Sequence, residues 1–358
     1  MKKISFCGLA FALFVTLSSL VACNSSEKMP EQSKLSIVTT IYPEYAWTKE
    51  ILGSHADSVN LTLLMKNGVD LHSYKPTAQD IAKIASADMV VYVGGESDEW
   101  IKDALEASPK KGRSEINLME ALGDRVKAEE VIEGMQGETK EDAEENHEHG
   151  EHAEEHEHHE HHDEHAEEHH HHHDHEEEVE NDEHVWLSLK NAEILVQKIA
   201  AELAKKDSAH ATLYTENAKD YIAKIQSLDA EYRTTIDSAA RKTVLFGDRF
   251  PFRYLVDDYG LKYYAAFVGC SAESEASFET IAFLAGKMDS LSLPAIFTIE
   301  KGNQKIARAI LDASKNSKEA QVLTLNSMQS VTEQQIAEGF SYLSIMESNL
   351  EVLKQALK

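Results

Sequence analysis

A long acidic tract rich in histidine divides this chain and limits where a folded core can form. The 358 residues include 19 histidines, and fifteen of these lie between His147 and His175, interleaved almost entirely with Glu and Asp. Apart from a few alanines the tract has no apolar residues, so it cannot bury a core and is expected to be disordered. Any folded core must therefore come from the two stretches that flank it.

The composition of the tract predicts metal binding. Imidazole is the commonest protein ligand for zinc, copper and nickel, and with an ordinary pKa of about 6.5 most of these rings are neutral at pH 7. We interpret the tract as an auxiliary metal collector; a solvated acidic linker with incidental histidines is the alternative. Its histidines are His147, His149, His152, His156, His158, His159, His161, His162, His165, His169, His170, His171, His172, His173 and His175.

The negative charge of the chain is concentrated in and around this tract. The formal net charge is −28, yet residues 129–183 alone contain 25 acids and one base. The remainder is close to balanced, so the acidity favours cations as partners and gives no reason to expect nucleic acid.

The amino-terminal 34 residues have the features of an exported lipoprotein. A short basic start and a nearly uncharged run to Ala22 are typical of a signal peptide over 1–22. The run Leu-Val-Ala-Cys at 20–23 is similar to a bacterial lipobox, which predicts lipidation of Cys23 and a polar tether over 23–34. An ordinary signal peptide is the alternative. We expect an extracytoplasmic protein that is lipid-anchored to the membrane of a bacterial cell envelope.

Strand-like and helix-like segments alternate on both sides of the tract. Apolar runs at 35–41, 59–65 and 88–93, separated by amphipathic stretches, indicate a parallel sheet covered on both faces. Residues 188–240 lack Gly and Pro and read as two helices, the second about thirty residues long. Alternation then resumes from 242, and one closing helix is predicted over 332–357.

The predicted fold class is therefore α/β, with two lobes, each a small mostly parallel sheet flanked by helices, joined by one long linking helix. The expected boundaries are an amino-terminal lobe at 35–187, interrupted by the disordered insertion at about 128–183, a helical linker at 188–240 and a carboxy-terminal lobe at 241–358. Ligands of such proteins bind between lobes, beyond the carboxyl ends of strands.

Four local motifs carry a resemblance to a known family. They are Gly-Val-Asp-Leu-His-Ser-Tyr-Lys-Pro at 68–76, Asn-Asp-Glu-His-Val-Trp-Leu at 181–187, the run from Arg249 to 261, and the run at 341–350. With them, nearly all of the mature chain resembles the metal-specific substrate-binding proteins of bacterial ABC importers, in the zinc/manganese cluster and most like its zinc-type members.

The resemblance implies that His72 and His184 are metal ligands. The third family ligand, a His or Glu, falls on Arg249, and arginine cannot bind a cation because it stays protonated. The fourth, usually an acid, falls near 326–328, where the chain has no carboxylate.

Replacement ligands are expected at the carboxyl ends of second-lobe strands. Cys270, the only cysteine outside the signal peptide and lipobox, is one candidate, Glu300 is a second and Asp248 a third. A site of His72, His184 and Cys270, completed by a carboxylate or water, would be tetrahedral and selective for zinc over manganese.

The function that the resemblance implies is capture of Zn²⁺ as bound substrate and its delivery to an ABC-type membrane permease with its ATPase. We expect a monomer. We also expect that the protein is not an enzyme, since no HExxH or nucleophile-elbow motif is present. The alternatives are a surface metal-buffering or adhesion lipoprotein, or an importer component for manganese or nickel. His55 and His210 lie in no motif and are expected to be surface residues.

Overall fold

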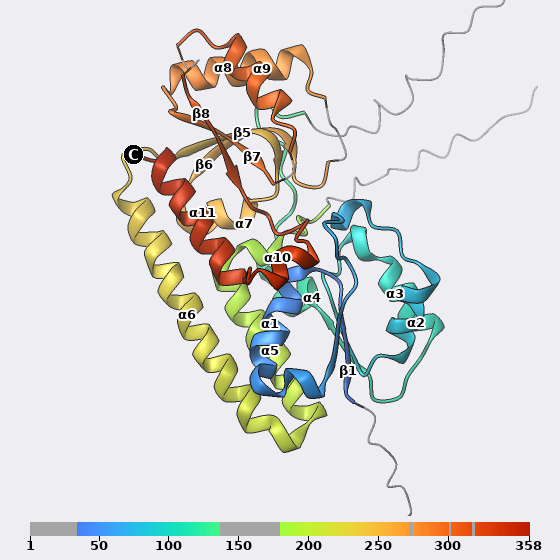
Figure 1. Cartoon of the computed structure of the whole chain (residues 1–358). Helices are drawn as coiled ribbons and strands as arrows, with labels where there is room; N and C mark the ends of the chain where they lie inside the picture. The colour runs from blue at the N-terminus through green and yellow to red at the C-terminus, as the bar shows by residue number, and fades with distance from the viewer. Residues whose placement is uncertain (1–33, 137–179, 272–274, 301, 317–318) are drawn as a thin grey trace, which may run out of the picture. The chain divides into compact units, whose positions relative to one another are not determined.

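The computed structural model describes residues 34–136, 180–271, 275–300, 302–316 and 319–358 (Figure 1). The predicted lipidation site Cys23 and all fifteen histidines of the tract lie outside these residues. Residues 35–358 form one compact unit. No described helix has the length and apolar character needed to cross a membrane.

A four-stranded parallel sheet of order β2-β1-β3-β4 forms the first lobe. Its strands are β1 (Ser36–Thr39), β2 (Asn60–Leu63), β3 (Met89–Tyr92) and β4 (Ser114–Asn117), and its helices are α1 (Tyr42–Leu52), α2 (Ala78–Ser86), α3 (Trp100–Ala107) and α4 (Leu118–Leu122). All four residues of β3 are buried because helices cover both faces of the sheet. α2 and α3 lie over one face of the sheet and α1 over the other (Figure 1). Val90 is buried with residues of α2 and α3, and Val91 with residues of α1.

The second lobe repeats this plan with the parallel order β6-β5-β7-β8. Its elements are β5 (Thr243–Phe250), α7 (Arg253–Tyr259), β6 (Lys262–Val268), α8 (Phe278–Ser290), β7 (Ala295–Ile299), α9 (Lys305–Ala313) and β8 (Gln321–Leu325). α8 and α9 cover one face through a cluster around Phe267. The pairing of β5 with β6 shifts register between Phe246 and Arg249, at the end of β5 that carries Asp248.

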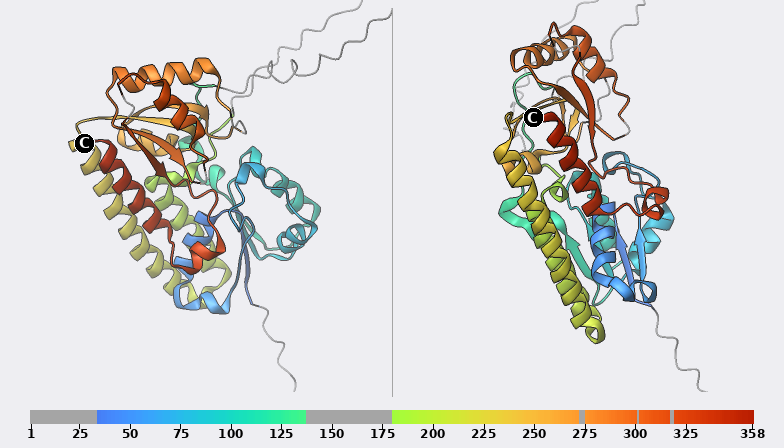
Figure 2. Two further views of the ribbon diagram at one scale, coloured as in Figure 1. Left: turned by 45° about the horizontal axis from the view of Figure 1, so that its top comes forward. Right: turned by 60° about the vertical axis from the view of Figure 1, so that its left-hand side comes forward.

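Long helices join the two lobes, and one of them is the long linking helix that the sequence predicts. They are α5 (Leu189–Lys206), α6 (Ala211–Ser238) and α11 (Tyr342–Ala356). α6 has 28 residues, a length of about 42 Å at 1.5 Å per residue. Its buried residues recur every three or four positions, and the hydroxyl of Tyr232 donates to the Met346 carbonyl at 2.6 Å. Figure 2 shows α6 beside α11 in two further views.

The elements differ from the sequence expectation in two places. The predicted closing helix is divided into α10 (Glu333–Ala337) and α11, because Gly339 has a φ of 94° and Ser341 caps the second helix. The edge strand β4 has only one buried residue, Ile116, so no apolar run marks it in the sequence. Two parallel sheets flanked by helices confirm the predicted fold class.

Candidate metal centre

His72 lies on the short turn η2 (Leu71–Ser73), in a loop of the first lobe. Asp70 caps this turn, since its Oδ1 accepts a hydrogen bond from the His72 backbone N at 3.0 Å. The ring Nδ1 lies 2.7 Å from Ser97 Oγ and 3.6 Å from Glu183 Oε2. These partners favour a proton on Nδ1, which leaves the Nε2 lone pair available to a metal.

Glu183 places a buried carboxyl group beside this ring. Its Oε1 accepts from Ser97 N at 2.8 Å, whereas its buried Oε2 has no hydrogen-bond partner within the described part of the chain. It packs so closely over Gly95 that a Cβ there would lie 2.2 Å from Oε1. Because a buried carboxylate oxygen is costly without a partner, its position favours a cation nearby.

His184 is fully buried and is oriented by a residue two positions earlier. Asp182 Oδ1 accepts both from the His184 backbone N, at 2.8 Å, and from Nδ1, at 2.9 Å. Tyr254 holds Asp182 in turn, since its hydroxyl donates to the Asp182 carbonyl at 2.8 Å. A metal-binding imidazole usually has a carboxylate on its other ring nitrogen, and here that contact leaves Nε2 as the nitrogen that can bind a metal.

Cys270 brings a thiol from the second lobe to these two rings. It follows β6, and its backbone N donates to Glu129 Oε1 at 3.0 Å. One ligand atom each from His72, His184 and Cys270 lie within 4.8 Å of one another, and the two Nε2 atoms are 3.2 Å apart. Ligand atoms around a tetrahedral zinc ion are separated by about 3.3–3.6 Å, so a small inward shift of the thiol suffices.

Burial and neighbouring charge move the pKa values of all three groups. Burial, reinforced by the charge of His184, lowers the pKa of His72 to about 3. Burial lowers the pKa of His184 too, but the Asp182 carboxylate outweighs it and leaves this pKa raised. Burial and the Glu129 carboxylate raise the pKa of the Cys270 thiol. The raised pKa values favour protons on His184 and Cys270, with which a metal ion must compete, whereas the lowered pKa keeps His72 neutral at pH 7.

The other two candidate ligands, Glu300 and Asp248, are not part of this three-residue group. Glu300 accepts from Ser327 N at 2.7 Å, Ser327 Oγ at 2.8 Å and Gln329 N at 3.1 Å. Asp248 accepts from the backbone N of Arg249 at 2.9 Å and of Ile299 at 3.2 Å. Both carboxyl groups thus organise second-lobe loops.

Arg249, where the resemblance implies a ligand position, bridges the two lobes. Its guanidinium donates to Asp70 Oδ2 at 2.8 Å, while the other oxygen of Asp70 caps the turn that carries His72. A pocket of about 220 Å³ beside this ion pair is lined by both residues and by Asp248 and Glu300. The arginine therefore links the second lobe to the residue that caps the His72 turn.

Gln329 is a site residue that the sequence did not indicate. Its Nε2 lies 2.8 Å from His184 Nε2, and its Oε1 accepts from Ser327 Oγ at 2.9 Å. Glu300 is therefore connected to His184 through Ser327 and Gln329. A single neutral amide outside any motif carries no signal that would have identified it.

The chain on both sides of the histidine tract reaches the site. Glu129 N donates to the Glu180 carbonyl at 2.8 Å, and Ala128 bridges Asn181. Gln136 N donates to the Ala266 carbonyl on β6 at 2.9 Å. Residues next to the tract thus position Glu129, Asp182 and Glu183 around the ligand cluster.

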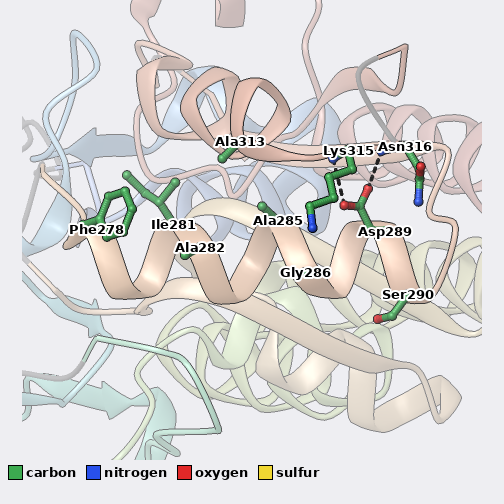
Figure 3. A pocket seen from close by; sticks show the side chains of 10 residues that line it. All are labelled: Phe278, Ile281, Ala282, Ala285, Gly286, Asp289, Ser290, Ala313, Lys315 and Asn316. Atoms are coloured by element: carbon green, nitrogen blue, oxygen red, sulfur yellow. Dashed lines mark hydrogen bonds between the residues drawn. The ribbon is translucent and has the colours of Figure 1, made fainter.

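A larger surface pocket, of about 560 Å³, lies beside α8 (Figure 3). Its walls are apolar at Ile281 and Ala285, and at one end Asp289 accepts from the backbone N of Lys315 and Asn316, each at 2.8 Å. It contains no histidine or cysteine and shares no residue with the metal cluster. It is therefore not the candidate site.

Two parallel sheets, long joining helices and a cluster of histidine and cysteine side chains drawn from both lobes are features of the class of two-lobed binding proteins. Residues 37–356 match the family described as zinc-uptake complex component A, periplasmic (ZnuA), and the chain belongs to this family. The expected resemblance to zinc-type metal-binding proteins is thereby confirmed.

Known members of the family match most of the chain. The zinc-binding lipoprotein AdcA of Streptococcus pneumoniae is 34% identical over 99% of this chain, which spans 61% of that relative's length. The high-affinity zinc uptake system protein ZnuA of Bacillus subtilis is 32% identical over 97% of this chain and 96% of its own. Among solved structures, the crystal structure of the Zn(II)-bound ZnuA-like domain of S. pneumoniae AdcA is similar to this chain, with 29% sequence identity and a TM-score of 0.64. The match covers 90% of this chain and 99% of that domain.

Proposed function

We propose that this protein is the extracytoplasmic zinc-binding component of an ABC-type metal importer, and that His72, His184 and Cys270 hold Zn²⁺ as its transported substrate. The supporting observation is that three distant segments bring their ligand atoms within 4.8 Å of one another. A fourth ligand comes from water or a carboxylate such as Glu300. Relatives named for zinc binding and zinc uptake support the same substrate.

The thiol makes zinc the preferred ion. Thiolate ligands suit zinc, whereas manganese favours carboxylate, carbonyl and water oxygens. Manganese import is therefore the weaker alternative, and nickel remains a competitor because imidazole suits both ions. Zinc should bind more tightly than manganese to the wild type, and Cys270→Ser should narrow that difference.

Delivery requires partners and an anchor. We propose that lipidated Cys23 tethers the protein to the cell envelope membrane and that a permease with its ATPase receives the ion. The tract over 147–175 acts as a low-affinity collector, because neutral imidazoles and carboxylates are both zinc ligands. Nothing in this role requires catalysis; binding and release are the whole activity.

Zinc affinity, measured by competition with a chromophoric chelator, tests the site. Deleting 140–178 removes the tract and keeps Glu129, Asp182 and Glu183, and this variant should retain one tight site. Adding Cys270→Ser should weaken that site by about 100-fold or more, beyond the 10–100-fold cost typical of an outer-shell partner. Equal affinity in the two variants would remove the thiol from the site.

Growth under zinc limitation tests import. Cells that depend on this protein should lose zinc-limited growth with His184→Ala and keep it when only 140–178 is deleted. A surface metal-buffering or adhesion protein would leave growth unchanged in both cases, and the importer proposal would then fail.

A further inference from the structure

A second group of side chains that can bind a metal lies at the turn between α5 and α6, apart from the candidate metal centre. The turn contains Asp207, which caps the end of α5, and η6 (Ser208–His210). η1 (Gly53–Ser58), the turn that follows α1, carries His55. Figure 1 shows the α5–α6 turn beside the end of α1. No residue is shared with the cluster of His72, His184 and Cys270.

One carboxylate oxygen is the centre of this group. Asp207 Oδ2 lies 2.7 Å from His210 Nδ1 and 3.4 Å from His55 Nε2, and the Tyr214 hydroxyl donates to it at 2.7 Å. The two imidazole rings stack with centroids 3.7 Å apart. One ligand atom from each of the three residues lies within 4.8 Å of the other two. The side chains of His55 and His210 are 19% and 41% exposed, and the sequence expectation of surface residues did not include this grouping.

The fold holds the two turns together independently of these side chains. Asn217 on α6 donates to the Ile51 carbonyl at 2.9 Å, and Gly53 approaches so closely that a Cβ would lie 2.4 Å from Asn217 Nδ2. Gly53 has a φ of 52°, which favours glycine at this turn. His55 is therefore delivered to Asp207 by backbone geometry.

The chemistry of the group suits a divalent ion of the zinc class. Two imidazoles and one carboxylate form a common ligand set for zinc and other first-row metals, with water in the open positions. Tetrahedral zinc separates its N and O ligands by about 3.4 Å, which equals the present 3.4 Å between His55 and Asp207. The rings must turn out of their stack to direct both lone pairs at one ion, and His210, with 41% of its side chain exposed, has room to do so.

We propose that His55, Asp207 and His210 bind a second divalent metal ion of the zinc class, which clamps the turn after α1 to the α5–α6 turn. This site is separate from the transport site and does not depend on it. A metal-free, hydrogen-bonded histidine pair is the outcome that would contradict the proposal.

Amide hydrogen exchange of the full chain, with and without zinc, tests the proposal locally. Exchange that requires these turns to separate slows by the factor 1 + [Zn]/Kd, or about tenfold at a zinc concentration ten times Kd. Peptides covering 53–58 and 207–211 should show this slowing in the wild type. His55→Gln and Asp207→Asn should lose it, while zinc still slows exchange around His72 and His184.

Two controls separate a metal site from other effects of zinc. Tyr214→Phe removes a hydrogen bond to Asp207 but no ligand, so its zinc response should remain. His72→Ala disrupts the transport site and should also leave the response of 53–58 and 207–211 intact. If zinc does not slow these segments in the wild type, or slows them equally in His55→Gln, there is no metal site here.

Discussion

The first-lobe and second-lobe sides of the metal centre are built in different ways. Asp70 and Asp182 each lie two residues before the histidine that they position, so both contacts are local. Cys270 instead bonds to Glu129, 141 residues away in the chain. Each histidine therefore has local support from its own loop, although Ser97 and Glu183 also contact the His72 ring, whereas the thiol takes its place only when the second lobe and the segments beside the tract have assembled.

Removing a histidine should produce the largest effect. Structural zinc sites with four ligands bind with about 10–16 kcal/mol, so one ligand accounts for roughly 3 kcal/mol, or about 100-fold in Kd. His184→Ala should exceed this, at about 1000-fold, because Asp182 also loses the partner that it orients. Chelator competition measures the change, and circular dichroism of the metal-free variant must show an unchanged fold. If His184→Ala weakened zinc binding less than Cys270→Ser does, the second-lobe side of the site would contribute more to affinity than the first-lobe side.

The pH dependence of zinc affinity should distinguish the thiol from the histidines. The pKa values of His184 and Cys270 are raised, so zinc competes with protons for both groups, whereas the His72 pKa of about 3 leaves that ring neutral, with no proton for zinc to displace from Nε2. Below the raised pKa of His184, log Kd should rise by about two for each unit that pH falls; above it, by about one.

Cys270→Ser should lower the slope of log Kd against pH by one in each of these ranges, because the variant has no thiol proton to release. Its log Kd should change by about one per pH unit below the His184 pKa and stay nearly constant above it. Calorimetry in buffers of different ionisation enthalpy counts the released protons directly. Equal proton release by the variant and the wild type would show that the thiol does not bind zinc.

Neutralising a carboxyl group that supports the ligands should weaken zinc binding more on the first-lobe side than on the second-lobe side. Asp182→Asn removes the charge that orients His184 and should weaken zinc binding by about 10–100-fold. Glu300→Gln is the matched change on the second lobe, where the carboxylate bonds to Ser327 and Gln329 and is not in the ligand group. It should change affinity less than Asp182→Asn; a larger change would identify Glu300 as the fourth ligand.

This difference in construction explains which site residues sequence could predict. His72 and His184 lie in motifs together with their own supporting carboxylates, so their roles are visible over a few residues. Arg249 reaches Asp70 across 179 positions, and Gln329 reaches His184 across 145. Such pairs exist only after folding, and no local pattern marks them.

The same reasoning applies to the fold. β3 was predictable because four consecutive apolar residues are buried, whereas β4 has the sequence Ser-Glu-Ile-Asn and one buried side chain. The pairing of His55 with His210 was likewise invisible, since it depends on the packing of η1 beside the α5–α6 turn. Periodicity reports the burial of a segment; it does not report which segment will lie next to it.

The ion pair between Arg249 and Asp70 should have the smallest effect on affinity, and it tests whether the two sides of the centre are coupled. Both side chains are about one-fifth exposed, so the pair should contribute about 1 kcal/mol, or roughly fivefold in Kd. Asp70→Asn keeps an oxygen for the His72 backbone N and replaces the charged oxygen that Arg249 contacts with an amide NH2.

A double-mutant cycle of Arg249→Gln and Asp70→Asn therefore isolates the contact between lobes. If the pair holds the lobes together over the bound ion, each single variant should raise the zinc dissociation rate, and the double variant should be little worse than either. Stopped-flow transfer of zinc to a chelator measures these rates. Fully additive effects would mean that Arg249 acts on the second lobe alone, and the thiol side would then be positioned independently of His72.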